Sequence, residues 1–369
     1  MNPAVSDTIR MARILCILLL VYAHAQPYQP GVPESLLSPM GLIHYLRQLL
    51  GHTSVPLLSL ISGYLLARTL SARPFMEELG NKWVSLVVPL VLWNLIYIAK
   101  VYLESGLETA PAVHEWPNAV LAISAPPAMM PLYFLRDAFV CFLMSPALIY
   151  LARKLPGTAA AALLLNALLN MDGVLFINSA IPLFYFAGCV LLVHQVSIST
   201  HALPWKPVWA AGLAMVLLSI VAFHMPSEPG VSEPSSVADA AVDIALRTAG
   251  CVVFWSVASK LVHNRAGSLL LPFEPMAFFI FCAHGMAAGL WWMAIVRLGY
   301  AEVTPVFLGY FVLSPLLALI ACVAAVWSIR RVTPGGLSLL MGGRIPNQQQ
   351  MASMFKPLGH KHLARTTGV

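Results

Sequence analysis

Two histidines and an arginine stand out because each lies in an otherwise apolar segment. His24 follows the run ILCILLLVY, eleven residues after Arg13, and His284 lies in PMAFFIFCAHGMAAGLWW. On an α-helix that spacing puts Arg13 and His24 about 20° apart around the axis and ~16 Å apart along it. An arginine binds anions, and a neutral imidazole acts as a general base or a nucleophile. The spacing therefore predicts one helix face that joins an anion site to a catalytic imidazole.

A structural interpretation of the same residues stays open. Arg13 also fits the basic residues that anchor a membrane helix, His24 fits an interface residue, and His284 fits a satisfied core histidine. Ionisable groups within apolar helices are costly, however, and two histidines at similar depth favour function. We therefore predict catalytic roles for Arg13, His24 and His284.

Further basic residues gather near the start of this helix and its neighbours. Phosphate groups prefer clustered Arg and Lys donors, so the cluster is a candidate cofactor-binding footprint. An excess of basic residues in cytoplasmic segments would produce the same pattern without any ligand. The cluster comprises Arg10, Arg13, Arg68, Arg73 and Lys82.

Polar residues near the opposite ends of two apolar segments are candidates for binding a polar substrate. His52 precedes the run VPLLSLISGYLLA, and Arg136 and Asp137 are adjacent in PLYFLRDAF. An equally open interpretation is that Arg136 and Asp137 form an ion pair that locks a helix bundle together.

The composition decides which elements must position these residues. The 369 residues are 59% hydrophobic and only 10% charged, against ~25% charged in soluble domains. This excludes a soluble enzyme, and the net charge of +6 does not indicate a nucleic-acid partner but basic residues beside a lipid bilayer. Six widely spaced cysteines lie in apolar runs without a CxxC pair, so we expect neither disulfides nor a bound metal.

Apolar stretches of membrane-spanning length predict an all-α polytopic membrane protein with a bundle of about ten transmembrane helices. Most of the 21 Lys and Arg residues fall on one side of this arrangement, which places both termini in the cytoplasm. The predicted segments are 11–26, 45–67, 83–103, 130–152, 158–172, 174–193, 207–224, 244–262, 275–296 and 303–328.

The two ends of the chain raise separate questions. Arg10 and Arg13, an apolar run and Ala23-His24-Ala25 imitate a secretory signal with its cleavage site, although we expect the segment to be retained. Residues 1–331 form the predicted membrane domain. Residues 332–369 are Gly-rich, polar and basic, and we expect a disordered cytoplasmic tail near anionic lipid headgroups.

Several motifs, in order along residues 8–330, resemble the integral-membrane acyltransferase-3 family. Arg13 and His24 match its first-helix signature of an arginine, ten residues and a histidine. The segments VPLLSLISGYLLA, PLYFLRDAFVCFLMSPAL, IPLFYFAGCVLL and FFIFCAHG are similar to its later motifs. One motif departs, since NKWVSLVVP keeps Lys82 but has Ser85 where the family usually has a second basic residue.

The resemblance implies an enzyme that transfers an acyl group, acetyl or succinyl, from cytoplasmic acyl-CoA to a hydroxyl of an extracytoplasmic polysaccharide or glycan. It implies a plasma (bacterial inner) membrane location and an exopolysaccharide-modifying type. It also implies that the first helix is retained, since that helix carries the signature. The competing hypothesis is a transporter or flippase for a glycan or lipid-linked precursor, in which the same polar residues line a pathway.

Overall fold

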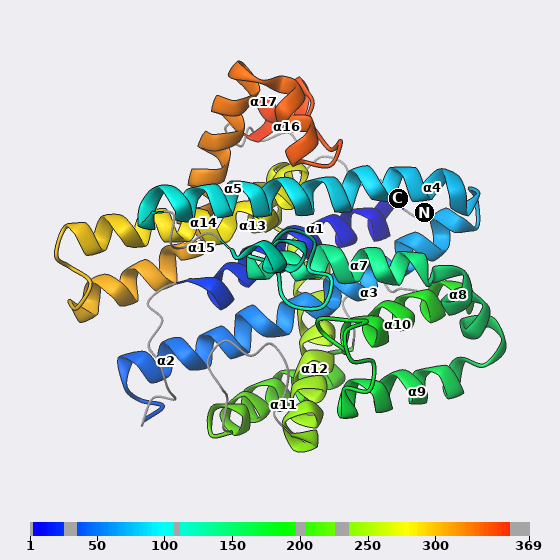
Figure 1. Cartoon of the computed structure of the whole chain (residues 1–369). Coiled ribbons are helices and arrows are strands. Elements are labelled where there is room, and N and C mark those ends of the chain that lie inside the picture. The colour runs from blue at the N-terminus through cyan, green and yellow to red at the C-terminus, as the bar shows by residue number, and fades with distance from the viewer. Residues whose placement is uncertain (1–2, 26–34, 107–110, 197–203, 226–235, 355–369) are drawn as a thin grey trace, which may run out of the picture.

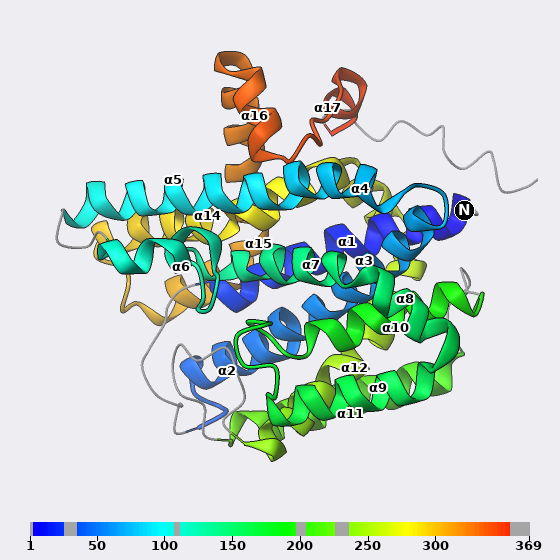
Figure 2. The same ribbon diagram turned by 45° about the vertical axis from the view of Figure 1, so that its right-hand side comes forward.

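The structure is a computed structural model that describes residues 3–25, 35–106, 111–196, 204–225 and 236–354. Over these residues the secondary structure is entirely helical. The long helices run side by side as a bundle, with α1 in its middle (Figures 1 and 2). The six cysteines are buried and free.

The helices of the first half include two π-helical turns, η1 and η3, which lie within longer continuous helices. The bounds are α1 Pro3–His24, α2 Pro39–Leu46, η1 Arg47–Gly51, η2 His52–Ser54, α3 Val55–Leu70, α4 Phe75–Lys82, η3 Trp83–Val87, α5 Val88–Ser105, η5 Val113–Glu115, α6 Trp116–Leu121, η6 Met130–Leu132, α7 Tyr133–Leu143, α8 Ser145–Lys154 and α9 Pro156–Leu169. Those of the second half are α10 Ile181–Val193, α11 Trp205–Phe223, α12 Val237–Leu261, α13 Arg265–Leu270, η7 Leu271–Met276, α14 Ala277–Arg297, α15 Thr304–Val332, α16 Pro334–Leu340 and α17 Gln348–Met354.

Every predicted apolar segment contains a helix, but not all of these helices have the length and composition of a membrane span. Among the described residues five do, or six if the pair α7–α8, bent by 61°, counts as one. The five are Pro39–Leu70, Phe75–Glu104, Trp205–Phe223, Arg265–Arg297 and Thr304–Val332. The chain is therefore a helical membrane protein, while ten spans and the cytoplasmic termini stay predictions.

Two of the predicted spans are shorter than expected. The helix α9 has 14 residues and α10 has 13, and residues 170–180 between them form turns. A span of ~20 residues is needed to cross the hydrocarbon core of a bilayer. The predicted segments 158–172 and 174–193 are separated by a single residue, which suggests a tight helical hairpin. The contact between α9 and α10 fits that arrangement.

The helix α1 is the centre of the packing. It contacts α3, α12, α14 and α15, and most of its apolar side chains are buried, with Met11, Ile14, Cys16 and Val21 completely so. α1 carries Asp7, Arg10 and Arg13, and it is not among the candidate spans by composition. These three charged side chains are partly exposed, at 46%, 39% and 34%, and each forms an ion pair.

Close backbone contact fixes α3 against α10. A Cβ added at Gly63 of α3 would overlap the carbonyl of Tyr185, and one at Gly188 of α10 would overlap the carbonyl of Leu60. Small residues let two helix backbones approach in this way. The crossing positions Tyr185 and the α3 residue Ser62 on the wall of the cavity described below.

Residues 334–354 of the predicted tail contain two helices, while residues 355–369 lie outside the described structure and their disorder stays a prediction. Residues 334–340 form α16 and residues 348–354 form α17, and both lie at one side of the bundle (Figure 1). Leu337 and Met341 are completely buried in the main hydrophobic core. Trp93 on α5 donates a hydrogen bond from Nε1 to the Leu340 carbonyl, at 3.0 Å. The apolar residues of PGGLSLLM, spaced one helical turn apart, explain the docking.

Candidate active site

A cavity of about 230 Å³ lies among α1, α3, α7 and α14. Its walls are mostly apolar, with Leu58 and Ile61 from α3 and Phe278 and Phe281 from α14. No carboxylate is among its described lining residues. A chamber of this kind suits a ligand that combines an apolar or neutral arm with negative charge.

Three basic residues from separate parts of the chain line this cavity. Arg13 comes from α1, Lys82 from the end of α4, and Arg344 from the turn between α16 and α17. Arg13 and Lys82 belong to the predicted phosphate footprint. Arg344 was not predicted, because it lies in the segment assigned to the tail.

The guanidinium of Arg13 is also held by a carboxylate. Its Nη1 lies 2.9 Å from Oε1 of Glu274 in η7, whose side chain is 11% exposed. Arg10 reaches the other oxygen of the same carboxylate, at 3.3 Å, and also pairs with Asp7. Glu274 therefore fixes Arg13 at the cavity edge and draws Arg10 away from it, so only Arg13 of the two is available to a ligand there.

Arg68 and Arg73, the remaining members of the predicted footprint, do not line the cavity. Arg68 is exposed at the end of α3. Arg73 is 57% exposed and pairs with Glu78 at 3.2 Å. Their cofactor-binding roles stay predictions without support from the geometry.

The two predicted histidines meet although 260 positions separate them in sequence. The ring centroids of His24 and His284 are 5.1 Å apart, with the planes tilted by 52°. His24 closes α1 and is half-buried, whereas His284 lies within α14 and is completely buried. The packing of α1 on α14 creates this pair.

The hydrogen bond of His284 defines its tautomer. Nδ1 lies 2.7 Å from the Phe281 carbonyl, which can only accept, so Nδ1 carries the proton. The lone pair of the neutral ring is then on Nε2, a buried atom with no hydrogen-bond partner among the described residues. Neither His284 nor His24 is among the residues that line the cavity, although the ring of Phe281, which does line it, has its centroid 6.3 Å from that of His284.

The π-turn η1 packs against the His24 end of α1. A Cβ at Gly51 would come within 2.5 Å of the Ala23 nitrogen, so the two backbones are in direct contact. Arg47 of the same turn donates to the Ala25 carbonyl, directly after His24. Sequence reasoning did not single out Arg47. The backbone of His52 follows this turn in η2, and its side chain is outside the described structure.

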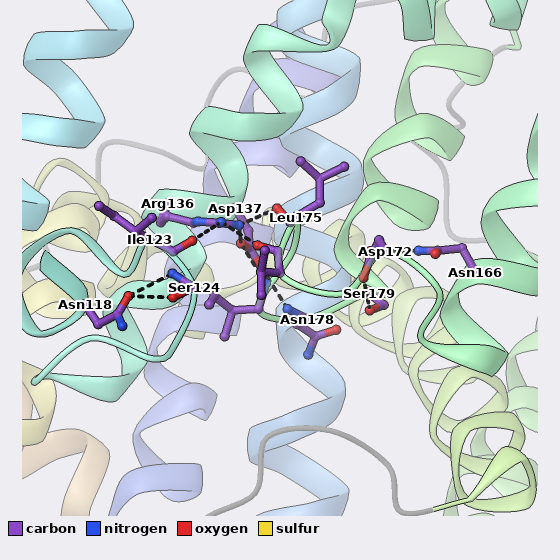
Figure 3. Close-up of polar contacts among 12 residues, drawn as sticks. Asn118, Ile123, Ser124, Arg136, Asp137, Asn166, Asp172, Leu175, Asn178 and Ser179 are labelled. Atoms are coloured by element: carbon purple, nitrogen blue, oxygen red, sulfur yellow. Dashed lines mark hydrogen bonds and ion pairs between the residues drawn. The ribbon is translucent and has the colours of Figure 1, made fainter. Parts of the chain in front are cut away.

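Arg136 and Asp137 form a closed polar cluster (Figure 3). Asp137 is completely buried and accepts hydrogen bonds from the backbone nitrogens of Ile177 and Asn178, at 2.9–3.1 Å. Arg136 pairs with Asp137 at 2.9 Å and donates to the carbonyls of Ile123, Val174 and Leu175. This is the locking ion pair, and neither residue lines the cavity. Substrate binding by them stays a prediction.

Within the described parts of the chain no three His, Cys, Asp or Glu side chains are arranged to hold a metal ion. The charged groups that line the cavity are instead basic, and the two imidazoles lie against each other outside its lining. Their chemistry is anion binding combined with proton transfer.

Comparison with known proteins identifies the family of the chain. The family model described as an acyltransferase domain matches residues 7–329, which include α1 from residue 7 onward. The chain is 31% identical over 363 residues to the succinoglycan biosynthesis protein ExoH of Rhizobium meliloti (strain 1021), covering 93% of this chain and 94% of that protein. No solved structure matches. The chain therefore belongs to the acyltransferase-3 family of membrane proteins.

Proposed function

We propose that this protein is an O-acyltransferase that moves an acetyl or succinyl group from cytoplasmic acyl-CoA to a hydroxyl of an extracytoplasmic polysaccharide. The observation that carries the proposal is the arrangement along α1. Arg13 lines a cavity at one end, and His24 lies against His284 at the other. The relative named for succinoglycan biosynthesis supports an exopolysaccharide acceptor.

The residues divide the reaction between the two ends of α1. Arg13 and Lys82 bind phosphate groups of the donor, and the apolar walls take up the arm that carries the thioester. The ~16 Å rise between Arg13 and His24 is a reach that a pantetheine-length arm spans. A polar donor then stays on one side of the membrane while its acyl group approaches the acceptor on the other.

The imidazole pair carries the proton. A neutral ring nitrogen takes the proton of the acceptor hydroxyl while the hydroxyl oxygen attacks the thioester carbonyl carbon. The carbon–sulfur bond breaks, an ester forms, and the proton passes to the thiolate to release free coenzyme A. His24 is the base, and the buried ring of His284, whose centroid lies 5.1 Å from that of His24, holds it in position. Transfer through an acylated His24 gives the same products.

The proposal also fixes a membrane and a topology. The protein lies in the bacterial inner membrane with both termini cytoplasmic, so that the basic end of α1 faces the cytoplasmic donor pool. Ten helical segments cross or re-enter the bilayer in this arrangement.

The test measures free thiol released from acetyl-CoA or succinyl-CoA by purified protein with and without polysaccharide, and the mass of the polysaccharide product. Wild-type protein is expected to release thiol only with acceptor and to add one acyl mass per event. His24→Gln is expected to lower the rate by about 10²–10⁴-fold, the usual contribution of a general base.

The matched control is His194→Gln. The ring of His194 lies 2.9 Å from the Ala152 carbonyl, and His194 is not part of the His24–His284 pair. The control is expected to keep wild-type activity. Full activity of His24→Gln at equal protein level would contradict the mechanism. A wild-type protein that moves a glycan across vesicles without consuming acyl-CoA would establish the transporter hypothesis instead.

A further inference from the structure

The C-terminal segment delivers a guanidinium to the cavity from outside the part of the chain that the family model matches. That match ends at residue 329, and Arg344 lies fifteen residues further on. The segment is held by the buried residues Leu337 and Met341 and by a hydrogen bond of 3.1 Å from Arg330 to the Pro346 carbonyl. Arg344 is thus part of a docked element.

A glycine turn sets the position of Arg344. Gly342 has φ +57° and Gly343 has φ +80°, a region that favours glycine. A Cβ at Gly342 would also come within 2.7 Å of the Ser85 carbonyl oxygen. Only glycine at position 342 lets the turn approach η3 this closely. Arg344, which directly follows the two glycines, then lines the cavity.

The contacts of Arg344 hold its plane and, within the part of the chain that the structure describes, leave most of its N–H donors without an acceptor. Nη1 donates to the Ser85 carbonyl at 3.3 Å, and the guanidinium lies 4.2 Å from the ring centre of Phe278. Pro89 has no N–H to donate to Ser85, its usual helical partner four residues earlier, so this carbonyl is open to a side chain. A guanidinium has five N–H donors, and stacking leaves its edges accessible.

Charge at the cavity is unbalanced. Among the described residues neither Lys82 nor Arg344 forms an ion pair with a carboxylate, and Glu274 offsets only the charge of Arg13 at this cavity. Burial, and next the charge of Arg13, lower the pKa of Arg344 to about 10, so it is cationic at neutral pH. Adjacent buried cations repel each other, and a bound polyanion removes that cost.

We infer that Arg344 completes, with Arg13 and Lys82, a binding site for the phosphate groups of the acyl donor. The inference rests on the proposed function for the donor being an acyl-CoA. It assigns the C-terminal segment a direct role in donor binding. It also places a guanidinium against the Ser85 carbonyl, in the motif NKWVSLVVP, where serine stands in place of a second basic residue.

The test is calorimetric titration of coenzyme A into full-length protein in a zwitterionic detergent. Arg344→Gln is expected to raise the Kd about 10-fold or more, as for loss of a charge-assisted hydrogen bond. Arg344→Lys is expected to lie between the two, since it keeps the charge without the planar fork. Intermediate affinity of Arg344→Lys, with the thermal midpoints of both variants at the wild-type value, would show that Arg344→Gln loses ligand binding rather than folding.

The charge-matched control is Arg331→Gln. Arg331 is exposed, stacks on Trp327 and does not line the cavity, so the Kd is expected to stay at the wild-type value. An Arg344→Gln variant that binds coenzyme A as wild type does would overturn the inference and leave the proposed function intact. Wild-type protein that neither binds coenzyme A nor releases thiol would overturn both.

A lipid phosphate is the other source of the same chemistry. The titration is repeated in nanodiscs of phosphatidylcholine with and without phosphatidylglycerol. An Arg344→Gln variant that loses affinity for phosphatidylglycerol but not for coenzyme A would assign Arg344 to a headgroup and overturn donor binding. Equal loss of coenzyme A affinity in both nanodiscs supports it.

Discussion

The His24–His284 pair and the Arg136–Asp137 cluster both place polar groups within apolar helices. They differ in whether the hydrogen-bonding atoms of the buried groups have partners. Asp137 accepts from two backbone nitrogens and from Arg136, whose own donors end on backbone carbonyls. His284 instead keeps Nε2 without a partner in the described chain, next to His24. Buried groups normally satisfy their hydrogen bonds, so a saturated cluster indicates structure and a spare acceptor beside a second imidazole indicates chemistry.

The comparison predicts that the histidine pair matters for activity and little for folding. His284→Gln is expected to lower acyl transfer by about 10²-fold or more while stability in detergent falls by only about 1 kcal/mol, because Nδ1 loses one hydrogen bond to the Phe281 carbonyl and Nε2 has none to lose. Thiol release and thermal unfolding on the same preparation measure both. Full activity of the variant would show that His284 has a structural role rather than a role in acyl transfer.

The opposite result is expected for the closed cluster. Asp137→Asn turns an amide N–H₂ or a single oxygen toward two backbone N–H donors and leaves Arg136 without its counter-charge. We expect about 3 kcal/mol lower free energy of unfolding, as for removing one partner of a buried ion pair. Denaturant titration in detergent measures this. A stable variant that specifically loses acceptor affinity would restore the substrate-binding role.

A smaller effect, on donor affinity, is expected at Glu274, because it forms ion pairs with two arginines and one of them lines the cavity. Glu274→Gln removes the carboxylate that holds Arg13 at 2.9 Å and Arg10 at 3.3 Å. Because Arg13 is then free to pair with donor phosphates, the Kd for coenzyme A is expected to fall about 2–5-fold, within the range of a partly exposed ion pair. Titration calorimetry measures the change, and a weakened Kd would show that Glu274 positions Arg13 for binding.

The smallest effect is expected at the exposed end of α3. Arg68→Gln removes a basic residue of the predicted footprint that does not line the cavity. Donor affinity and stability are expected to stay within about 0.5 kcal/mol of wild type, as for surface substitutions generally. A clear loss of coenzyme A affinity would extend the phosphate site beyond Arg13, Lys82 and Arg344.

Much of the site could be predicted because helical geometry is local. The eleven-residue spacing of Arg13 and His24 determines their common face on α1, and the apolar segments locate the helices that hold His284 and Lys82. The short helices α9 and α10 and the bend between α7 and α8 were harder to predict, because hydrophobicity does not reveal where turns interrupt a buried run.

The sequence by itself determined the membrane class, the helical segments, the family resemblance and the α1 axis, since these depend on composition and on contacts between near neighbours. Only the tertiary structure decided that His24 meets His284, that Glu274 pairs with two arginines, and that Arg344 enters the cavity. Each of these contacts joins residues hundreds of positions apart, and packing of the helices brings them together. Hydrophobic periodicity records which face of a helix is buried, but not which distant side chain it will touch.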